Sequence, residues 1–372
     1  MRIETLAVHA GGERDPVSHS VAPPLHLSTN YELGAGSEML GGYIYVRYSN
    51  PTQERLESAL AALEGGETAA VFGSGVAAGA AALQALPAGS HVIFPDDVYY
   101  QFYTMASEYL PRWGMESTIV DMSDIERVRA AVRPNTRLIW AETPSNPLLK
   151  IVDLAGVAAV AREAGASALV DSTFATPVLQ RPLELGFDVV LHSTTKYMGG
   201  HGDVQGGALV FARRGPLFDA VRRIRDVQGS VASPFNSWLV LRGLRSLPCR
   251  MDRHTTNAGA VATYLASHPD VEAVHYPGLS SHPGHEVAKR QMKGFGGMLS
   301  FRLKAGADAA IAVTTRTKLF VNATSLGGPE SLIEHRSSSE GPHSTTPKNL
   351  LRLSVGLENA EDLIEDLGQA LA

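Results

Sequence analysis

One lysine of this chain follows directly on a run of hydroxyl residues. Lys196 comes after Ser193, Thr194 and Thr195, and the apolar run 187–191 precedes them. A strand that ends in these residues would bring hydroxyls, backbone amides and a shielded amine to one point, where the lysine can form a Schiff base with an aldehyde cofactor such as pyridoxal phosphate. The alternative is a solvated lysine in a polar loop, because Ser/Thr-Lys alone is a weak motif.

A carboxylate precedes this lysine by 25 residues, at the end of another apolar run. Asp171 follows residues 168–170. An acid there can keep the nitrogen of a pyridine ring protonated, so that the ring accepts electrons while the lysine holds the aldehyde. The pair Asp171 and Lys196 therefore favours pyridoxal chemistry over coincidence.

A candidate phosphate site lies earlier in the chain. Gly73, Ser74 and Gly75 follow an apolar run and precede the helix-like VAAGAAALQAL. Glycines at a helix amino terminus offer unpaired amides to a phosphate. Polar residues also follow other runs, namely Asp96, Asp97, Tyr99 and residues 142–147. Taken singly, each of these groups is as well explained by a turn or a helix cap.

The elements that would position these residues alternate along the chain. Short apolar runs, each followed by a helical pattern, predict strands at 69–72, 91–94, 118–120, 138–141, 168–170, 189–191 and 207–211. This alternation predicts an α/β fold with a mostly parallel sheet and helices on both faces. Ligands of such sheets bind beyond the carboxyl ends of the strands, which is where the polar residues stand.

The pattern changes twice along the chain and predicts three parts. Residues 1–50 are rich in Gly, Pro, Ser and Tyr without a helical period, so we expect an extended arm that reaches a neighbouring subunit. A helix from Thr52 opens a large domain, 51–232. Residues 233–372 predict a smaller α+β domain, with a helix break at Pro248 and a last amphipathic helix.

Composition narrows the class of protein. With 44% hydrophobic and 19% charged residues over 372 positions, the chain predicts a folded, soluble protein. A net charge of −6 without long runs of one sign argues against a nucleic-acid partner or a polybasic membrane patch. The single Cys249 and the absence of a signal-like apolar segment predict a cytoplasmic location. The histidines show no metal-ligand spacing, so no metal is expected; those considered are His192, His201, His282, His285, His335 and His343.

Seven motifs, in order, resemble the pyridoxal-phosphate enzymes of cysteine and methionine metabolism, which include cystathionine and methionine gamma-lyases and cystathionine gamma-synthases. The resemblance covers nearly the whole chain and implies fold type I, a C-terminal small domain and a homotetramer with shared active sites. The motifs are YIYVRYSNPT (43–52), LEGGETAAVFGSGVAA (63–78), ETPSNP (142–147), DSTFATP (171–177), HSTTKYMGGHGDV (192–204), SLGGPESLIEH (325–335) and LRLSVGLE (351–358).

The resemblance implies a role for each matched residue. Lys196 would carry the cofactor and act as the acid-base group, Asp171 would face the ring nitrogen, and Tyr99 would stack on the ring. Asn146 would lie near the ring hydroxyl, and Arg352 would bind the substrate carboxylate. The residues expected to hold the phosphate are Gly75, Val76, Ser193 and Thr195, with Tyr45 and Arg47 of a neighbouring subunit.

Strand periodicity supports the role of Arg352. In LLRLSVG, Arg352 and Ser354 share one face of a strand and the leucines the other, so the guanidinium can point into a pocket and bind a carboxylate through two hydrogen bonds. The alternative is an exposed strand arginine.

Several departures from the family bear on the substrate. Tyr100 and Gln101 follow Tyr99, where the family usually has smaller residues, and Ile44 and Thr324 stand where cystathionine gamma-lyases carry acids. Next to Thr324, Ser325 is also expected at the substrate. The segment 336–349 is short and begins with Arg336 in place of the usual proline. Without these acids a distal ammonium would be costly to bury, so the sequence predicts a preference for uncharged γ-substituents.

These observations predict a pyridoxal-phosphate carbon–sulfur lyase that catalyses γ-elimination on methionine, homocysteine or cystathionine-like substrates. One alternative is γ-replacement on an O-acylhomoserine, which passes through the same intermediate. The other is a regulator that binds the cofactor without turnover, which the full set of Lys196, Asp171, Tyr99 and Arg352 disfavours. The sequence leaves open which amino acid is used and whether elimination or replacement follows.

Overall fold

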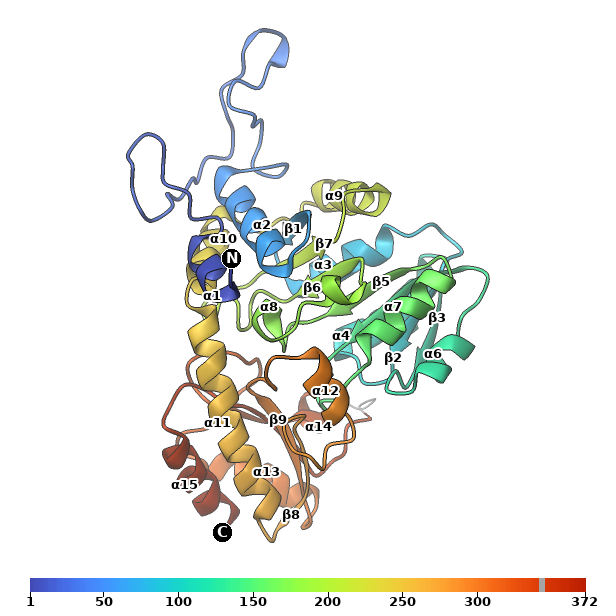
Figure 1. The fold of residues 1–372 in the computed structure, drawn as a ribbon, viewed down its shortest axis with the longest axis vertical. Coiled ribbons are helices and arrows are strands. Elements are labelled where there is room, and N and C mark those ends of the chain that lie inside the picture. Colours follow the sequence, from blue (N-terminus) through green and yellow to red (C-terminus); the bar gives the residue numbers. More distant parts are fainter. Residues whose placement is uncertain (341–344) are drawn as a thin grey trace.

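The computed structural model describes residues 1–340 and 345–372, and its strands form two sheets (Figure 1). Among the described residues, seven strands form the larger sheet in the order β1-β7-β6-β5-β4-β2-β3. The strands are β1 Thr68–Phe72, β2 His91–Pro95, β3 Glu116–Val120, β4 Thr136–Glu142, β5 Ser167–Asp171, β6 Val189–His192 and β7 Gly207–Phe211. All seven predicted strands are confirmed.

The larger sheet is mostly parallel, as predicted. Strands β3, β2, β4, β5 and β6 pair in parallel, whereas β7 pairs antiparallel with both β6 and β1. The carboxyl ends of β4, β5 and β6 therefore meet at one edge, where Glu142 pairs with Asp171 across the ladder. This edge is where the residues predicted to do chemistry gather.

Helices cover both faces of the larger sheet, because its strands are apolar on both sides. In β1, Ala69 and Val71 pack with Leu56 and Leu60 of helix α2, Pro51–Glu64. The alternate residues of β1 pack on the other face, with helix α3, Gly75–Gln84. The fold class predicted from alternating runs is confirmed.

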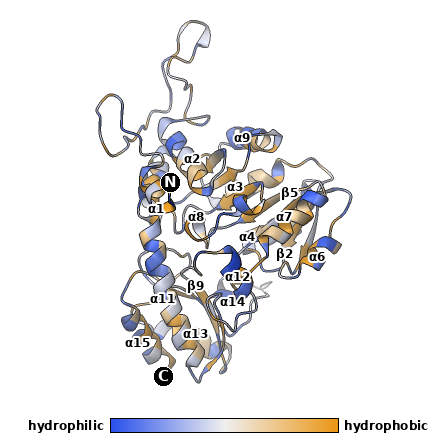
Figure 2. Ribbon diagram, in the orientation of Figure 1, coloured by the Kyte–Doolittle hydropathy of each residue, from blue (hydrophilic) through white to orange (hydrophobic). Residues whose placement is uncertain are grey.

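The remaining helices connect or cover the strands. They are α4 Tyr100–Thr104, η2 Met105–Tyr109, α5 Leu110–Arg112, α6 Ile125–Ala130, α7 Leu154–Glu163, α8 Thr176–Leu179, η3 Pro182–Leu185, α9 Pro216–Gln228, α10 Pro234–Leu244, α11 Leu247–Ser267, α12 His285–Gln291, α13 Ala307–Arg316, α14 Arg336–Ser339 and α15 Ala360–Leu371. In Figure 2 the short outer helix α12 is strongly hydrophilic, as expected for a helix with a solvated face.

The smaller sheet lies beyond the long helix α11, which runs along one side of the molecule (Figure 1). Its order is β10-β11-β12-β9-β8. Its strands are β8 Val271–His275, β9 Met298–Leu303, β10 Val321–Asn322, β11 Leu332–His335 and β12 Leu350–Ser354. Leu351 and Leu353 of β12 pack with residues of α11 and α15, and the alternate residues face the larger sheet's edge.

The helix break is near the predicted proline. Helix α10 ends at Leu244 and α11 begins at Leu247, so Pro248 lies in the first turn of α11, where its missing N–H costs nothing. The strands of the two sheets fall on either side of residue 233. Among the described residues, no helix is both long and apolar enough to cross a membrane.

The prediction of an unpatterned arm over residues 1–50 is wrong at its start. Residues Ile3–His9 form helix α1, and Ala7 is buried in the core cluster that contains α2 residues. A seven-residue helix is too short to show a periodic signal, and its packing partner lies far along the sequence. From about residue 13 onwards the chain extends away from the body (Figure 1), interrupted by a short 3-10 turn, η1 Ala35–Ser37.

Candidate active site

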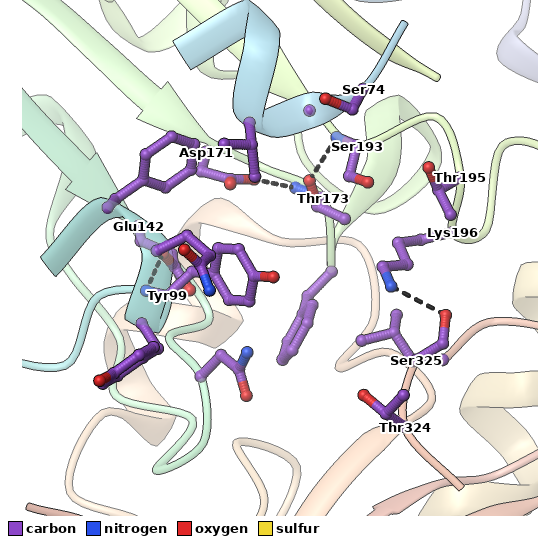
Figure 3. Close-up of a pocket in the computed structure, with 18 of the residues that line it drawn as sticks. Ser74, Tyr99, Glu142, Asp171, Thr173, Ser193, Thr195, Lys196, Thr324 and Ser325 are labelled. Carbon is purple, nitrogen blue, oxygen red and sulfur yellow. Dashed lines mark hydrogen bonds between the residues drawn. The ribbon is translucent and has the colours of Figure 1, made fainter. Parts of the chain in front are cut away.

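A cavity of about 300 Å³ opens at the carboxyl edge of the larger sheet, a size within the range of small-molecule sites. The ends of β1, β4, β5 and β6 form one wall. The other wall is formed by residues 324–326, Arg336, Ser339, Glu340 and Arg352. Figure 3 shows Lys196 reaching into this space towards Ser325. The predicted residues that line it are Gly75, Val76, Tyr99, Asn146, Asp171, Ser193, Thr195, Lys196, Thr324, Ser325 and Arg352.

Lys196 is held in the turn that follows β6. The strand ends at His192, so the hydroxyl residues Ser193 to Thr195 belong to the turn and not, as predicted, to the strand. Lys196 Nζ donates a hydrogen bond to Ser325 Oγ over 2.8 Å. Burial, followed by the positive charge of Arg352, lowers the pKa of Lys196 to about 8. A substantial fraction of this amine is therefore neutral near physiological pH.

Asp171 and Glu142 are two carboxyls side by side at the sheet edge. Both are buried, and they are cross-strand neighbours on β5 and β4. Burial raises the pKa of Asp171, whereas burial and the charge of Asp171 raise the pKa of Glu142 well above its usual value. Two such carboxyls favour a cation or a shared proton beside them. Sequence reasoning found Asp171 but took Glu142 only as a strand-end residue.

Asp171 is tied to the neighbouring turn through a short relay (Figure 3). Thr173 donates its N–H to Asp171 Oδ1 over 3.0 Å, and Thr173 Oγ1 accepts the N–H of Ser193 over 2.8 Å. This relay fixes the distance between the acid on β5 and the turn that carries Lys196. Thr173 lines the cavity, a role that the sequence did not predict.

The amino terminus of α3 lies against the same turn. Ser74 caps the helix by accepting the N–H of Ala77 over 3.1 Å. A Cβ at Gly75 would lie 2.9 Å from Ser193 Cβ, so only glycine allows this close approach. The first amides of α3 and the Ser193 side chain thus converge, as an anion site requires. Thr195 Oγ1 is engaged with the backbone of Gly206, both accepting and donating.

Tyr99 lines the cavity and contacts one of the two carboxyls through its backbone. Its N–H donates to Glu142 Oε2 over 2.8 Å, and its ring lies edge-on to Phe102 at 5.9 Å. Burial raises the pKa of the Tyr99 phenol, so this ring stays neutral and can stack on a planar ligand.

Arg352 is buried at the opposite wall and donates three hydrogen bonds. Its guanidinium donates to Asn146 Oδ1 over 2.9 Å, to the carbonyl of Ser325 over 3.1 Å and to Glu334 Oε2 over 2.5 Å. The predicted inward orientation is confirmed by this burial and by its place in the cavity wall. Its proximity to Asn146 was not foreseen, because the two residues are far apart in the sequence.

The segment after β11 contributes a second arginine to the cavity wall. Arg336, Ser339 and Glu340 all line the cavity, together with Tyr100 and Gln101. The sequence feature that hinted at this contribution was Arg336 itself, which replaces the proline usual in the family. The substitution marks this position as unusual, but the sequence does not show that the side chain points into the cavity. The rest of the short segment, 341–344, lies outside the described residues.

Three predicted site residues lie elsewhere. Ile44, Tyr45 and Arg47 are on the extended arm, and in the described part of the chain they do not line this cavity. Arg47 donates to the carbonyl of Asp226 over 3.0 Å, and its guanidinium lies 4.8 Å from the centre of the Tyr48 ring. Within a single chain, therefore, these three residues do not contribute to the wall of the described cavity.

The histidines have other partners. His192 is buried and bonded through Nε2 to Glu64 over 2.6 Å, and His335 contacts Ser338 and the carbonyl of Lys348. Among residues 1–340 and 345–372, no group of three potential ligands could hold a metal ion. His343 lies outside the described residues.

The residues present fit pyridoxal phosphate. The cavity combines an amine of lowered pKa, buried carboxyls suited to a protonated ring nitrogen, a neutral aromatic ring and a helix amino terminus brought close by Gly75. When bound, this cofactor withdraws electrons from the α-carbon of an amino acid. Lys196, Asp171, Tyr99 and the α3 amides are the groups that would hold it.

Comparison with known proteins agrees with this fit. The family model for the Cys/Met metabolism PLP-dependent enzymes matches residues 4–372. The chain is 48% identical to the cystathionine gamma-synthase of Mycobacterium tuberculosis, covering 99% of this chain and 96% of that protein. It is 43% identical to the cystathionine gamma-lyase of Bacillus subtilis, covering 100% and 99%. The crystal structure of metB from Corynebacterium glutamicum superposes with a TM-score of 0.97 at 44% identity, covering 100% of this chain and 98% of the other. The chain is a pyridoxal-phosphate enzyme of the cysteine and methionine metabolism family.

Proposed function

We propose that the protein is a carbon–sulfur lyase that catalyses γ-elimination on a sulfur amino acid. The observation that supports this most is the position of Lys196, a partly neutral amine set between the Asp171 side of the cavity and the carboxylate-binding Arg352. A base so placed can reach the α-carbon of an amino acid whose carboxylate is held by Arg352.

The chain's own residues would act in sequence. Arg352 binds the α-carboxylate and fixes the orientation of the α-carbon. Lys196, in its neutral form, takes the α-proton and then relays a proton at the β-carbon. Asp171 supplies the negative charge opposite the ring nitrogen, and Tyr99 covers the ring face. The departing γ-thiolate would take up a proton to leave as a thiol, and water would hydrolyse the released unsaturated amino acid to 2-oxobutyrate and ammonia.

The second candidate is γ-replacement on an O-acylhomoserine, with a thiol as the entering nucleophile. It shares the α- and β-proton steps, and the relatives named cystathionine gamma-synthase support it at 48% identity. Purified holoenzyme should be offered methionine, homocysteine, cystathionine and O-acylhomoserines with and without cysteine. Release of 2-oxobutyrate from a thioether substrate supports elimination, and thioether formation without keto acid would favour replacement instead.

The residue roles given above are part of this proposal, as are three features of organisation. These are an arm over 1–50, a cofactor domain over 51–232 and a small domain over 233–372. A homotetramer in the cytoplasm is proposed, in which Tyr45 and Arg47 serve the phosphate of a neighbouring subunit and Ile44 approaches that subunit's substrate. The extended arm, whose Tyr45 and Ile44 are exposed, supports this arrangement.

A further inference from the structure

The cavity wall contains a charged pair that the residue roles above leave unused. Arg336 and Glu340 lie one helical turn apart at helix α14, and both line the cavity that contains Lys196. Arg336 Nη2 donates to Glu340 Oε1 over 2.7 Å. Both side chains are buried, at 6% and 8% exposure, so this is not a solvated surface pair.

Arg336 is linked to the carboxylate-binding arginine through one acid. Glu334 accepts from Arg336 Nη1 over 3.2 Å and from Arg352 Nη2 over 2.5 Å. Ser339 Oγ also donates to Glu334 Oε1, over 2.8 Å. Glu334 thus bridges two guanidinium groups, Arg352 on strand β12 and Arg336 on helix α14.

Arg336 lines the cavity and lies close enough to Lys196 and Tyr99 to act on both through its charge. Its positive charge contributes to the lowered pKa of Lys196, after burial and Arg352, and it opposes the burial that raises the pKa of Tyr99. The Nε of Arg336 is buried and has no hydrogen-bond partner among the described residues. A buried donor of this kind favours a ligand with an acceptor.

A positive and a negative group at one end of a cavity complement a zwitterion. We propose that Arg336 and Glu340 bind the distal amino-acid head of a cystathionine-type thioether, the carboxylate at Arg336 and the ammonium at Glu340. This assignment rests on the proposed function at the same site. A carboxylate has about four acceptor positions, and Arg336 and Thr346 are among the donors to Glu340; the proposal adds the substrate's ammonium to them.

This proposal replaces the sequence-based preference for uncharged substituents. That preference considered only Ile44 and Thr324, at the positions where relatives carry acids. The structure places Glu340, from a segment that is short in this chain, in the same cavity as Thr324. An acid supplied from a different position can receive the same ammonium, and its arginine partner can receive the carboxylate beside it.

Three substrates and one main variant test the assignment. Steady-state kcat/KM of the holoenzyme is measured with cystathionine, with methionine, and with a homoserine ester whose acyl group ends in a carboxylate. Glu340→Gln keeps the shape but removes the charge that would meet the ammonium. We expect the cystathionine-to-methionine ratio of kcat/KM to fall about tenfold or more, mainly through KM, while the ester-to-methionine ratio holds or rises.

Glu334→Gln is the matched control, because Glu334 also contacts Arg336 but in addition holds Arg352. Since every substrate would present its α-carboxylate to Arg352, this variant should lower kcat/KM for all three substrates, including methionine, which has no distal amino-acid head. The proposal is contradicted if Glu340→Gln loses activity equally on all three substrates or keeps the wild-type cystathionine-to-methionine ratio of kcat/KM. Arg336 and Glu340 would then be a structural ion pair only.

Binding separates this inference from the proposed function. Cystathionine titrations, followed by the absorbance of the bound cofactor, report affinity even if the wild-type enzyme carries out replacement, in which cystathionine is a product. If the ratio of the cystathionine Kd to the methionine Kd is higher in Glu340→Gln than in wild type, the distal site is supported. Unchanged relative binding contradicts it, whichever reaction the enzyme performs.

Discussion

Ser325 accepts a hydrogen bond from Lys196 through its side chain, while its carbonyl accepts one from Arg352. One residue therefore sets the relative positions of Lys196, the proposed base, and Arg352, the proposed carboxylate-binding group. The backbone of Ser325 has φ 82°, a conformation that costs a residue with a side chain about 1–3 kcal/mol. The contacts on both sides of Ser325 hold it there.

Removing the Ser325 hydroxyl should slow the reaction without unfolding the protein. Ser325→Ala leaves Lys196 without this acceptor, so the amine is less well oriented, and kcat should fall about tenfold or more. Thr324→Ala is the matched control, because Thr324 lines the cavity, whereas the hydrogen bond from Lys196 goes to Ser325. A loss in Thr324→Ala as large as in Ser325→Ala, at equal Tm, would contradict this role.

Cofactor uptake should depend on the protonation of Lys196. Only the neutral amine attacks an aldehyde, and burial lowers the pKa of Lys196 from about 10.5 to about 8. The rate at which cofactor-free protein combines with pyridoxal phosphate should therefore rise with pH through a midpoint near 8. In Ser325→Ala the midpoint should move lower, because the lost acceptor stabilised the ammonium. A midpoint near 10.5 in the wild type would count against the buried environment.

Asp171→Asn should weaken cofactor function while sparing the fold. Asparagine keeps an oxygen for the Thr173 N–H but cannot balance a protonated ring nitrogen, so activity should fall about 10²-fold. In the cofactor-free wild type, burial raises the pKa of Asp171 in the folded state above its pKa in the unfolded state. The free energy of unfolding therefore falls as pH rises from the unfolded-state pKa to the folded-state pKa. The cofactor-free variant should thus have a Tm at neutral pH equal to or above that of wild type. A strongly lowered Tm would assign Asp171 a structural role.

Shared active sites can be tested by mixing subunits. If Arg47 serves a neighbour's phosphate, inactive Arg47→Ala and Lys196→Ala subunits refolded together should regain some activity, since some sites then combine two intact residues. Each variant refolded alone is the control. Mixed oligomers that stay inactive would mean that Arg47 does not act across subunits.

The parts predicted from sequence are those with local signals. The strands of the larger sheet are apolar on both faces and bounded by turns; Asp171 ends β5, and Lys196 lies in the turn after β6. Strand β11, Leu332–His335, was missed because it contains Glu334, a charge that is buried only because Arg336 and Arg352 pair with it. Such a pairing depends on the register of β11 with β12, which no local pattern encodes.

The pairing of Glu142 with Asp171 also could not be predicted from local sequence patterns. Glu142 and Asp171 end two strands that are neighbours in the sheet, but the order of strands is a property of the whole fold. Likewise, the cavity-lining position of Glu340 depends on how α14 packs near β12. The sequence could mark the segment 336–349 as unusual, but not show that it supplies charge to the cavity.

The identity of the cofactor lysine is the central claim, and one measurement tests it directly. The holoenzyme is reduced with borohydride and digested, and the labelled peptide is identified by mass spectrometry. The label should lie on Lys196 and be absent from Lys196→Ala. Lys150 is an internal comparison, because it is near the same sheet edge but ion-paired with Asp96 and Asp121. A label on Lys150 or any other lysine of the wild type, with Lys196 unmodified, would contradict the account of the site.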